Sequence, residues 1–386
     1  MHKVAVVYQI LAHYREPIFR RLCEQDYGVE FTLFSDSKNT INSVKAIDSE
    51  IAKLPVEKGG LRWKFVKNMK LPHHFLWQRG VVKLAFSKKY DTIIYLGDAY
   101  YLSTWVSCFL AKITGKRTLM WTHGFLSEEN GLKGYVRKHF YDLADGVLVY
   151  GDRAKNIMIK KGFDPKSIYV VYNSLDYEKQ KSLRSSVGVQ KCEALKKRLF
   201  PKSVEQPTIF FIGRLIKNKN LKLLLQVAKL LKNSGSEINI LFIGDGPERG
   251  QLERVTLEYD LKENVCFYGE CHEESELAPL IMMSDLCISP GSVGLTAMHA
   301  LAYGKPVITH DNLDRQKPEV EAIQPGKNGD LFQEGNFEEL CAKVESWLDR
   351  KVSSCECYDI IDKKYNPENQ CRIIMNAIAE VSKGGH

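Results

Sequence analysis

The stretch Cys287–His310, with the sequence CISPGSVGLTAMHALAYGKPVITH, decides how the second half of the chain folds. The apolar residues Leu286–Ile288 indicate a short buried strand, and the small residues 289–292 that follow are turn formers. Apolar residues recur at helical spacing from Leu295 until a Gly-x-Pro sequence ends the helix, and Val307–Ile308 resumes a buried strand. A glycine-containing loop that leads into a helix places backbone N–H groups at the carboxyl edge of a sheet, which suits a phosphate or a sugar hydroxyl. Taken in isolation, the segment is explained slightly better by packing alone.

The length and charge of the chain narrow the classes of protein to consider. Its 386 residues predict two domains of similar size. The 55 Lys and Arg exceed the 47 Asp and Glu, and the resulting net charge of +8 favours anionic partners such as phosphates or an acidic membrane surface. We expect a cytoplasmic protein, because we find neither a signal-peptide pattern nor an apolar run long enough to span a membrane. The 10 cysteines are scattered without paired CxxC units, so no zinc site is expected.

Short apolar strands alternate with helices along both halves of the chain. In the first half we expect strands at Val4–Ile10, Val29–Phe34, Asp91–Leu96, Arg117–Trp121, Gly146–Tyr150 and Ile168–Tyr172. In the second half we expect them at Thr208–Gly213, Ile238–Ile243 and Val265–Tyr268, before the stretch quoted above. This alternation predicts an α/β protein with a doubly wound parallel sheet in each half. The predicted parts are an N-terminal domain over 1–185, a charge-rich linker over 186–206, a second domain over 207–365, and a C-terminal helix over 366–386 that packs back toward the first domain.

Residues Lys58–Lys89 have the most unusual composition in the chain, because basic and aromatic residues alternate there without a single Asp or Glu. A basic surface with exposed aromatic residues is typical of a peripheral protein on anionic lipid. Binding of single-stranded nucleic acid is an alternative, and so is a helix pair with core aromatic residues and solvated lysines. The membrane-docking candidates are Arg62, Trp63, Lys64, Lys67, Phe75, Trp77 and Arg79.

Several polar residues of the first half follow predicted strands and are candidates for a cleft. Arg15 begins a helix after the first strand, where it either faces an anion or is a solvated surface arginine. His123 lies directly after a strand and beside a glycine, at the edge of the sheet where ligands bind. Asp98 and Asn173 follow two further strands. We therefore take Arg15, Asp98 and Asn173 as acceptor or cleft candidates.

The second half carries a series of motifs in a fixed order. They are Phe211-Ile212-Gly213-Arg214-Leu215 with Lys219, Ile243-Gly244-Asp245-Gly246-Pro247-Glu248, Val265-Cys266-Phe267-Tyr268-Gly269, Ser284-Asp285, the quoted stretch, Pro318-Glu319-Val320 and Asn328-Gly329. Together they resemble the donor-binding domain of retaining glycosyltransferases with the GT-B fold, the family 4-like or group 1 enzymes of bacterial surface-polysaccharide synthesis. Through His123-Gly124 and Asn173-Ser174 the first half more loosely resembles the acceptor domain of that family. The resemblance implies two Rossmann-like domains that face a central cleft.

The resemblance also implies roles for individual residues. When a sugar leaves a nucleotide diphosphate without a metal, fixed cations and helix N-termini must balance the growing negative charge. Arg214 and Lys219 lie where both can reach one diphosphate, and His123 matches the histidine near the donor sugar, so these three are the catalytic candidates. The donor-binding candidates are Gly213, Arg214, Lys219, Gly244, Gly246, Ser289, Gly291, Val293, Gly294, Leu295, Thr296, His299 and Glu319. We expect no cofactor and no metal.

One departure from the family pattern affects the donor site. The family has two glutamates in the quoted stretch, and Gly291 and His299 occupy their positions here. His299 can still hydrogen-bond a ribose hydroxyl, and Glu319 or Glu321 can compensate for a lost carboxylate. The substitutions leave open a non-catalytic protein that binds nucleotide sugars. A basic nucleic-acid-binding protein is a third possibility, although no recognised nucleic-acid module supports it.

The sequence therefore predicts a retaining, metal-independent glycosyltransferase of the hexosyltransferase class. Its donor would be a nucleotide-diphosphate sugar, and its acceptor a glycan, lipid-linked in view of the basic aromatic stretch. Soluble glycan acceptors and a related sugar-phosphate synthase are alternatives. We expect a role in surface polysaccharide synthesis, such as lipopolysaccharide or capsule, on the inner face of the cytoplasmic membrane.

Overall fold

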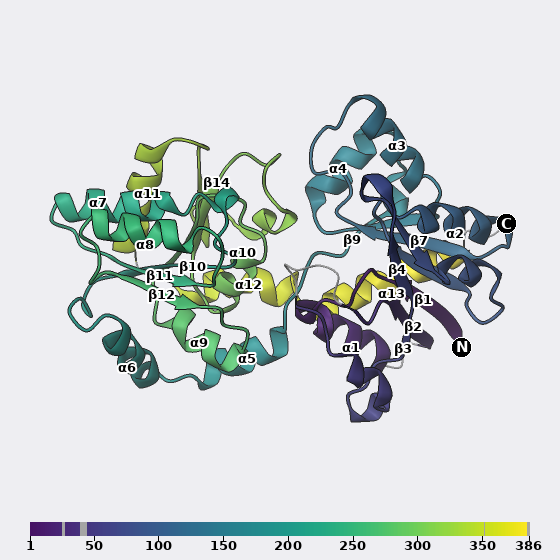
Figure 1. Ribbon diagram of the computed structural model, residues 1–386, viewed down its shortest axis with the longest axis horizontal. Coiled ribbons are helices and arrows are strands. Elements are labelled where there is room, and N and C mark those ends of the chain that lie inside the picture. The colour runs from purple at the N-terminus through teal and green to yellow at the C-terminus, as the bar shows by residue number, and fades with distance from the viewer. Residues whose placement is uncertain (25–27, 39–44, 351, 384–386) are drawn as a thin grey trace. The chain divides into compact units, whose positions relative to one another are not determined.

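The computed structural model describes residues 1–24, 28–38, 45–350 and 352–383. The chain forms two compact units (Figure 1). Unit 1 comprises Met1–Asp176 together with Asn366–His386, and unit 2 comprises Tyr177–Tyr365. Within the described residues, no helix is both long enough and apolar enough to cross a membrane.

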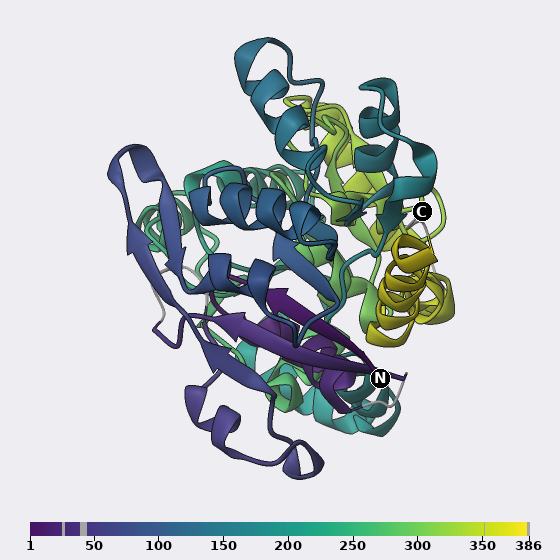
Figure 2. The same cartoon turned by 90° about the vertical axis from the view of Figure 1, so that its right-hand side faces the viewer.

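Unit 1 is built on a parallel sheet, which has seven strands among the described residues, in the order β3-β2-β1-β6-β7-β8-β9. The strands are β1 (His2–Val7), β2 (Val29–Ser35), β3 (Trp63–Phe65), β6 (Thr92–Leu96), β7 (Arg117–Thr122), β8 (Gly146–Val149) and β9 (Ile168–Val170). An antiparallel hairpin of β4 (Lys67–Lys70) and β5 (Leu76–Arg79) projects from the unit (Figure 2). The apolar residues of β1 alternate between the two faces of the sheet, since Val4 and Val6 join one core cluster while Ala5 and Val7 join the other.

Different helices cover the two faces of the unit 1 sheet. One face packs against α1 (Glu16–Glu24) and α13 (Pro367–Lys383), which also contact each other. The other face packs against the 3-10 helix η5 (Val81–Phe86), α2 (Leu102–Ile113), α3 (Gly131–Tyr141) and α4 (Asp152–Lys160). The C-terminal helix thus completes the core of the first unit (yellow in Figure 1). It corresponds to the helix predicted over 366–386, of which residues 384–386 lie outside the described residues.

Unit 2 repeats this architecture. Its parallel sheet has six strands among the described residues, in the order β12-β11-β10-β13-β14-β15. The strands are β10 (Thr208–Ile212), β11 (Asn239–Ile243), β12 (Val265–Gly269), β13 (Leu286–Ser289), β14 (Val307–His310) and β15 (Gly329–Phe332). The helices are α5 (Tyr177–Ser186), α6 (Val189–Leu199), α7 (Lys222–Asn233), α8 (Arg249–Glu258), α9 (Glu274–Met282), α10 (Leu295–Ala302), α11 (Phe337–Asp349) and α12 (Ser354–Lys363). Helices α7, α8 and α11 share a core cluster with the sheet, and α10 packs on β10, β13 and β14.

The segment 186–206 does not form the linker between domains that we expected from the sequence. Most of this segment is helix α6, and the boundary between the units lies between Asp176 and Tyr177. Helix α6 has no buried residue, so its charge-rich composition belongs to a surface helix rather than to an extended connection. Helix α5 is tied to unit 2 by Gln180, which is buried and donates a hydrogen bond to Glu274 on α9 (2.8 Å).

Candidate functional site

The loops after β10 and β11 lie in backbone contact at the carboxyl edge of the unit 2 sheet. The Gly213 N–H donates to the carbonyl of Ile243 (2.9 Å). Gly244 has a φ of 140°, and a Cβ there would lie 2.0 Å from the carbonyl oxygen of Gly213. A Cβ on Gly246 would lie 2.3 Å from the carbonyl oxygen of Leu215. The close contact between the two loops therefore requires glycine at Gly244 and Gly246.

The loop after β13 is packed equally tightly against the 3-10 helix η7 (Lys217–Lys219). A Cβ on Gly291 would lie 2.1 Å from the carbonyl oxygen of Asn218 and 2.7 Å from the Cα of Lys219. Both neighbours are backbone atoms, which cannot move aside as a flexible side chain can. The position that carries a glutamate in the family pattern therefore has no room for a side chain here.

A buried glutamine fixes the backbone of the same loop. Gln316 accepts a hydrogen bond from the Val293 N–H (2.8 Å) and donates to the Thr309 hydroxyl (2.8 Å). The Thr309 hydroxyl in turn donates to the carbonyl of Ser289 (2.7 Å). Val293 and Ser289 are fully buried, and the Val293 N–H is already hydrogen-bonded to Gln316. In the structure these two residues, which we predicted to contact the donor, are parts of the scaffold of the loop. Sequence reasoning missed Gln316, because an isolated glutamine between two motifs has no characteristic spacing.

Two of the cations that follow β10, Arg214 and Lys219, have different surroundings. Arg214 is exposed and makes no hydrogen bond or ion pair with any residue that the structure describes. Lys219 is half-buried and donates a hydrogen bond from Nζ to the carbonyl of Ser292. Burial lowers the pKa of Lys219 from 10.5 to about 8, although the nearby carboxylate of Glu319 opposes this shift. This edge of the sheet thus presents the exposed guanidinium of Arg214 and the poorly solvated ammonium of Lys219, both suited to an anion.

The remaining predicted donor residues lie around the start of α10. The Thr296 hydroxyl donates to the carbonyl of Ile212 (2.6 Å), and Gly294 has a φ of 53° immediately before Leu295, the first residue of the helix. His299 lies further along α10, where its Nδ1 is 3.4 Å from Nε2 of Gln180 and 3.9 Å from the carboxylate of Glu274. Burial lowers the pKa of His299, so the imidazole is neutral at pH 7. These contacts of His299 are with α5 and α9 rather than with the loop after β13.

Unit 1 contains a cavity of about 500 Å³ at the carboxyl ends of β1, β6 and β7. It brings together three predicted residues that are far apart in the sequence, Arg15, Asp98 and His123. The fourth candidate, Asn173, is buried, accepts the Ser174 N–H (3.1 Å), and does not occur among the described residues that line this cavity.

Aromatic side chains form much of the cavity wall around Arg15. Arg15 is only 6% exposed, so its interpretation as a solvated surface arginine is wrong. Its guanidinium donates to the hydroxyls of Tyr8 (2.7 Å) and Tyr150 and lies over the ring of Trp121. The ring of His123 lies 4.8 Å from that of Tyr150. Sequence reasoning missed these rings because each occurs singly in or directly after a different strand, and only the parallel sheet places the strand ends side by side.

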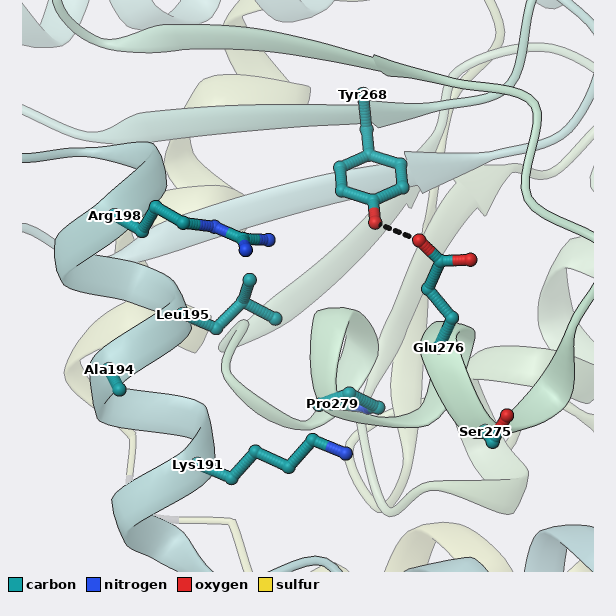
Figure 3. A pocket seen from close by; sticks show the side chains of 8 residues that line it. All are labelled: Lys191, Ala194, Leu195, Arg198, Tyr268, Ser275, Glu276 and Pro279. Carbon is teal, nitrogen blue, oxygen red and sulfur yellow. Dashed lines mark hydrogen bonds between the residues drawn. The ribbon is translucent and has the colours of Figure 1, made fainter.

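A second cavity, of about 520 Å³, lies between α6, β12 and α9 in unit 2. Figure 3 shows Arg198 and Lys191 on α6 across from Tyr268, whose hydroxyl is hydrogen-bonded to the carboxylate of Glu276. Its charged side chains Lys191, Arg198 and Glu276 are all exposed to solvent.

The basic aromatic stretch contains the strand β3, the hairpin of β4 and β5, and the 3-10 helix η5, rather than a helix pair. Trp63 is only 7% exposed and belongs to the core, so its prediction as a membrane-docking residue is wrong. Arg62 is half-buried and donates to the backbone carbonyls of Phe31 (3.0 Å) and Cys23, which gives it a structural role. The other predicted docking residues are Lys64, Lys67 and Arg79, which are exposed, and Phe75 and Trp77, which are half-buried.

Comparison with known proteins identifies the second unit. Residues 194–364 match the family model described as "Glycosyl transferases group 1". The chain is 28% identical over 131 residues to the putative glycosyltransferase EpsD of Bacillus subtilis, covering 33% of this chain and 32% of that protein. It spans about a third to a half of the length of the first curated relatives that it matches.

Two solved structures cover nearly the whole chain. HepE from Anabaena, in a complex with UDP, superposes with a TM-score of 0.74 at 16% identity, covering 98% of this chain and 100% of that one. The lipopolysaccharide outer core galactosyltransferase WaaB superposes with a TM-score of 0.70 at 18% identity, covering 98% and 99%. The chain therefore contains a glycosyltransferase group 1 domain and has the GT-B fold of two Rossmann-like parallel-sheet domains, so the predicted family resemblance and fold class are confirmed.

Proposed function

We propose that this protein is a retaining, metal-independent glycosyltransferase that moves a sugar from a nucleotide-diphosphate sugar to a lipid-linked glycan in surface polysaccharide synthesis. The observation that carries the proposal is the pair of cations after β10, at the carboxyl edge of a sheet in a group 1 domain. Parallel α/β sheets bind ligands at this edge. The UDP bound to HepE and the lipopolysaccharide substrate in the name of WaaB support the donor class and the pathway class.

The two cations divide the task of binding the diphosphate. The free guanidinium of Arg214 offers a bidentate fork to two phosphate oxygens, while Lys219 supplies a compact charge. As the bond to the sugar breaks, negative charge grows on the departing diphosphate, and preorganised cations in a partly dehydrated site stabilise it. Arrival of the diphosphate also raises the pKa of Lys219 again, which keeps the ammonium charged. Fixed cations can thus take the part that a metal plays elsewhere, which supports metal independence.

The remaining site residues have supporting parts in this proposal. Glu319, which is buried near Lys219, and the loop Gly291–Thr296 would hold the donor sugar. His123 would orient a sugar hydroxyl or support charge in the transition state, and the unit 1 cavity that contains it would receive the acceptor. We assign no ribose contact to His299, because its described contacts are with Gln180 and Glu274.

A basic apolar surface on unit 1 supports action at an anionic membrane. Helix α2 exposes Val106, Phe109 and Ile113, which are 40%, 55% and 67% exposed and recur at helical spacing on one side. The neighbouring η5 exposes Phe86, and Lys112 lies among these residues. No acidic residue occurs between positions 99 and 127 or between 58 and 89. Apolar side chains that insert and lysines that face lipid headgroups fit the inner face of the cytoplasmic membrane. We call these five residues the α2 surface.

A protein that binds nucleotide sugars without transferring them is the second candidate. The lack of space for a side chain at Gly291 favours this second candidate. The family pattern places a carboxylate near the donor sugar at this position, and no carboxylate can stand there in this chain. Both functions predict that the protein binds a nucleotide sugar, but only the glycosyltransferase predicts that the sugar is transferred.

Turnover of radiolabelled nucleotide sugars separates the two functions. The purified chain is incubated with UDP-, GDP-, ADP- and dTDP-sugars, with membrane extract as the acceptor source and EDTA present. The proposal predicts transfer of label into the lipid fraction from one donor, and an α-linked product from an α-linked donor by NMR. Nucleotide binding without transfer or donor hydrolysis would favour the binding protein, and an inverted anomer would contradict retention.

A further inference from the structure

The unit 1 cavity contains a buried cation that has no counterion among the described residues. Arg15 is 6% exposed, and its guanidinium contacts the hydroxyls of Tyr8 and Tyr150 and the rings of Tyr8, Tyr14, Trp121 and Tyr150. Among the residues that the structure describes, no carboxylate lies within ion-pair distance of its guanidinium. Arginine is almost never buried without such a partner.

The phenols around Arg15 cannot neutralise it. Burial raises the pKa of Tyr8 and of Tyr150, so both hydroxyls stay protonated at pH 7. Hydrogen bonds to neutral oxygens and contact with aromatic faces reduce the cost of burying a guanidinium, but they leave its charge in place. An anion that enters the cavity would find a cation that is already dehydrated and held in position.

The other charged residues of the cavity are already engaged. Arg137 donates to the carboxylate of Glu129 (2.7 Å), which balances that pair. Asp98 accepts the backbone N–H of Tyr100 (3.0 Å) and is half-buried. A carboxylate of this kind can accept a hydrogen bond from a sugar hydroxyl. The guanidinium of Arg15, which has no ion-pair partner among the described residues, suits an oxyanion. The lining therefore fits a ligand that carries both hydroxyls and a negative charge.

We propose that the unit 1 cavity binds an acidic acceptor sugar, and that Arg15 binds its phosphate or carboxylate oxygens. This inference rests on the proposed function, since it names the chemical class of the acceptor at the same site. The cavity volume of about 500 Å³ lies within the range for small-molecule sites. Both kinds of oxyanion present two oxygens to a guanidinium, so the two sources of charge are separated by experiment.

Trp121 provides a local probe, because its ring lies under the Arg15 guanidinium. The chain has 5 tryptophans, so the full-length protein labelled with ¹⁵N at the indole nitrogens gives a simple spectrum, in which Trp121→Phe assigns the signal. Trp347, which lies in unit 2, serves as the internal control. UDP is present at saturation so that the donor site is occupied. Glucose 1-phosphate, glucuronate and glucose are then titrated separately.

We expect the Trp121 signal to shift saturably with glucose 1-phosphate, glucuronate or both, and at least tenfold more weakly with glucose, while Trp347 does not move. The acid that acts at the lower concentration identifies the oxyanion. Equal response to neutral glucose, or no response of Trp121 to either acid, would overturn the proposal. In the second case an unchanged UDP affinity would leave the proposed donor site intact, so the two failures are distinguishable.

The variant Arg15→Gln separates binding from structure, with Arg79→Gln on the exposed hairpin as the charge-matched control. We expect Arg15→Gln to lose at least tenfold in affinity for the acid, to bind UDP unchanged, and to melt within about 4 °C of the unsubstituted protein, because it removes an uncompensated charge. A fall of more than 10 °C would mark Arg15 as a structural residue. Weaker binding of UDP by Arg15→Gln would indicate that Arg15 contacts the diphosphate of the donor rather than an acid group of the acceptor. Either result would overturn the proposal, and the titration of the unsubstituted protein decides independently if the variant does not fold.

Discussion

Replacing Lys219 by methionine should stabilise the ligand-free protein while weakening nucleotide binding. Methionine keeps much of the side-chain volume but carries no charge. The ammonium has a pKa of about 8 in the folded protein against its usual 10.5, and this difference of about 2.5 corresponds to about 3 kcal/mol of unfavourable free energy for the charged form. Loss of the hydrogen bond to the Ser292 carbonyl offsets roughly 1 kcal/mol of the gain. We therefore expect Lys219→Met to be more stable by about 1–2 kcal/mol at pH 7.

The dependence on pH tests the origin of this gain. Because the pKa of Lys219 is lower in the folded than in the unfolded state, the unfolded state binds more protons between pH 8 and 10.5. The penalty is thus fully present below pH 8 and is relieved as the pH rises, so the advantage of Lys219→Met should shrink by about 2 kcal/mol between pH 7 and pH 9.5. Urea unfolding at both pH values measures this, with Lys217→Met, an exposed neighbour, as the control.

Binding completes the test of Lys219. If its ammonium is kept in an unfavourable place for the sake of the diphosphate, Lys219→Met should bind UDP at least tenfold more weakly, since a charge-assisted hydrogen bond contributes about 1.5–3 kcal/mol. Titration calorimetry measures the affinity. A variant that is destabilised by more than 1 kcal/mol at pH 7, or that binds UDP as well as the unsubstituted protein, would refute the reasoning.

Two further variants, each with a matched control, test the packing and the surface. Gly291→Ala should lower the free energy of unfolding by about 2 kcal/mol or more, because its Cβ meets two backbone atoms, whereas Gly250→Ala on the open side of α8 should raise it by about 0.5–1 kcal/mol. Equal effects in urea unfolding would contradict the closed position of Gly291. The double variant Phe109→Ser with Ile113→Ser should lose sedimentation with phosphatidylglycerol vesicles, while Leu257→Ser, equally exposed on α8, should retain it. Unchanged sedimentation of the double variant would remove the α2 surface as the docking site.

The regular elements were predictable because their signals are local. The strand expected at Leu286–Ile288 is β13 (Leu286–Ser289), and the helix expected from Leu295 is α10 (Leu295–Ala302). A run of apolar β-formers, a glycine loop and a Gly-x-Pro end each act over a few residues. Local composition misled where it has two explanations, as in α6, whose charges equally fit a linker and an exposed helix.

The parts of the site that escaped prediction depend on contacts between distant residues. Arg15 is buried because Tyr8, Trp121 and Tyr150 come from three strands that only the sheet order brings together. Gly291 is required because η7 lies against it, more than 70 residues away in sequence, and the pKa of Lys219 is lowered by burial that only the folded structure creates. Trp63, which the sequence favours as a surface aromatic residue, belongs to the core because β3 joins the sheet beside β2.

The central claim is that the free guanidinium after β10 holds the diphosphate of a nucleotide sugar. Its most direct test is the melting temperature of the protein with UDP-, GDP-, ADP- and dTDP-sugars, compared among the unsubstituted chain, Arg214→Ala and the matched control Lys217→Ala. The account predicts a rise of about 5–10 °C for one nucleotide at 100 times its Kd, kept in Lys217→Ala and largely lost in Arg214→Ala. No rise with any nucleotide, or the same rise in Arg214→Ala, would contradict it.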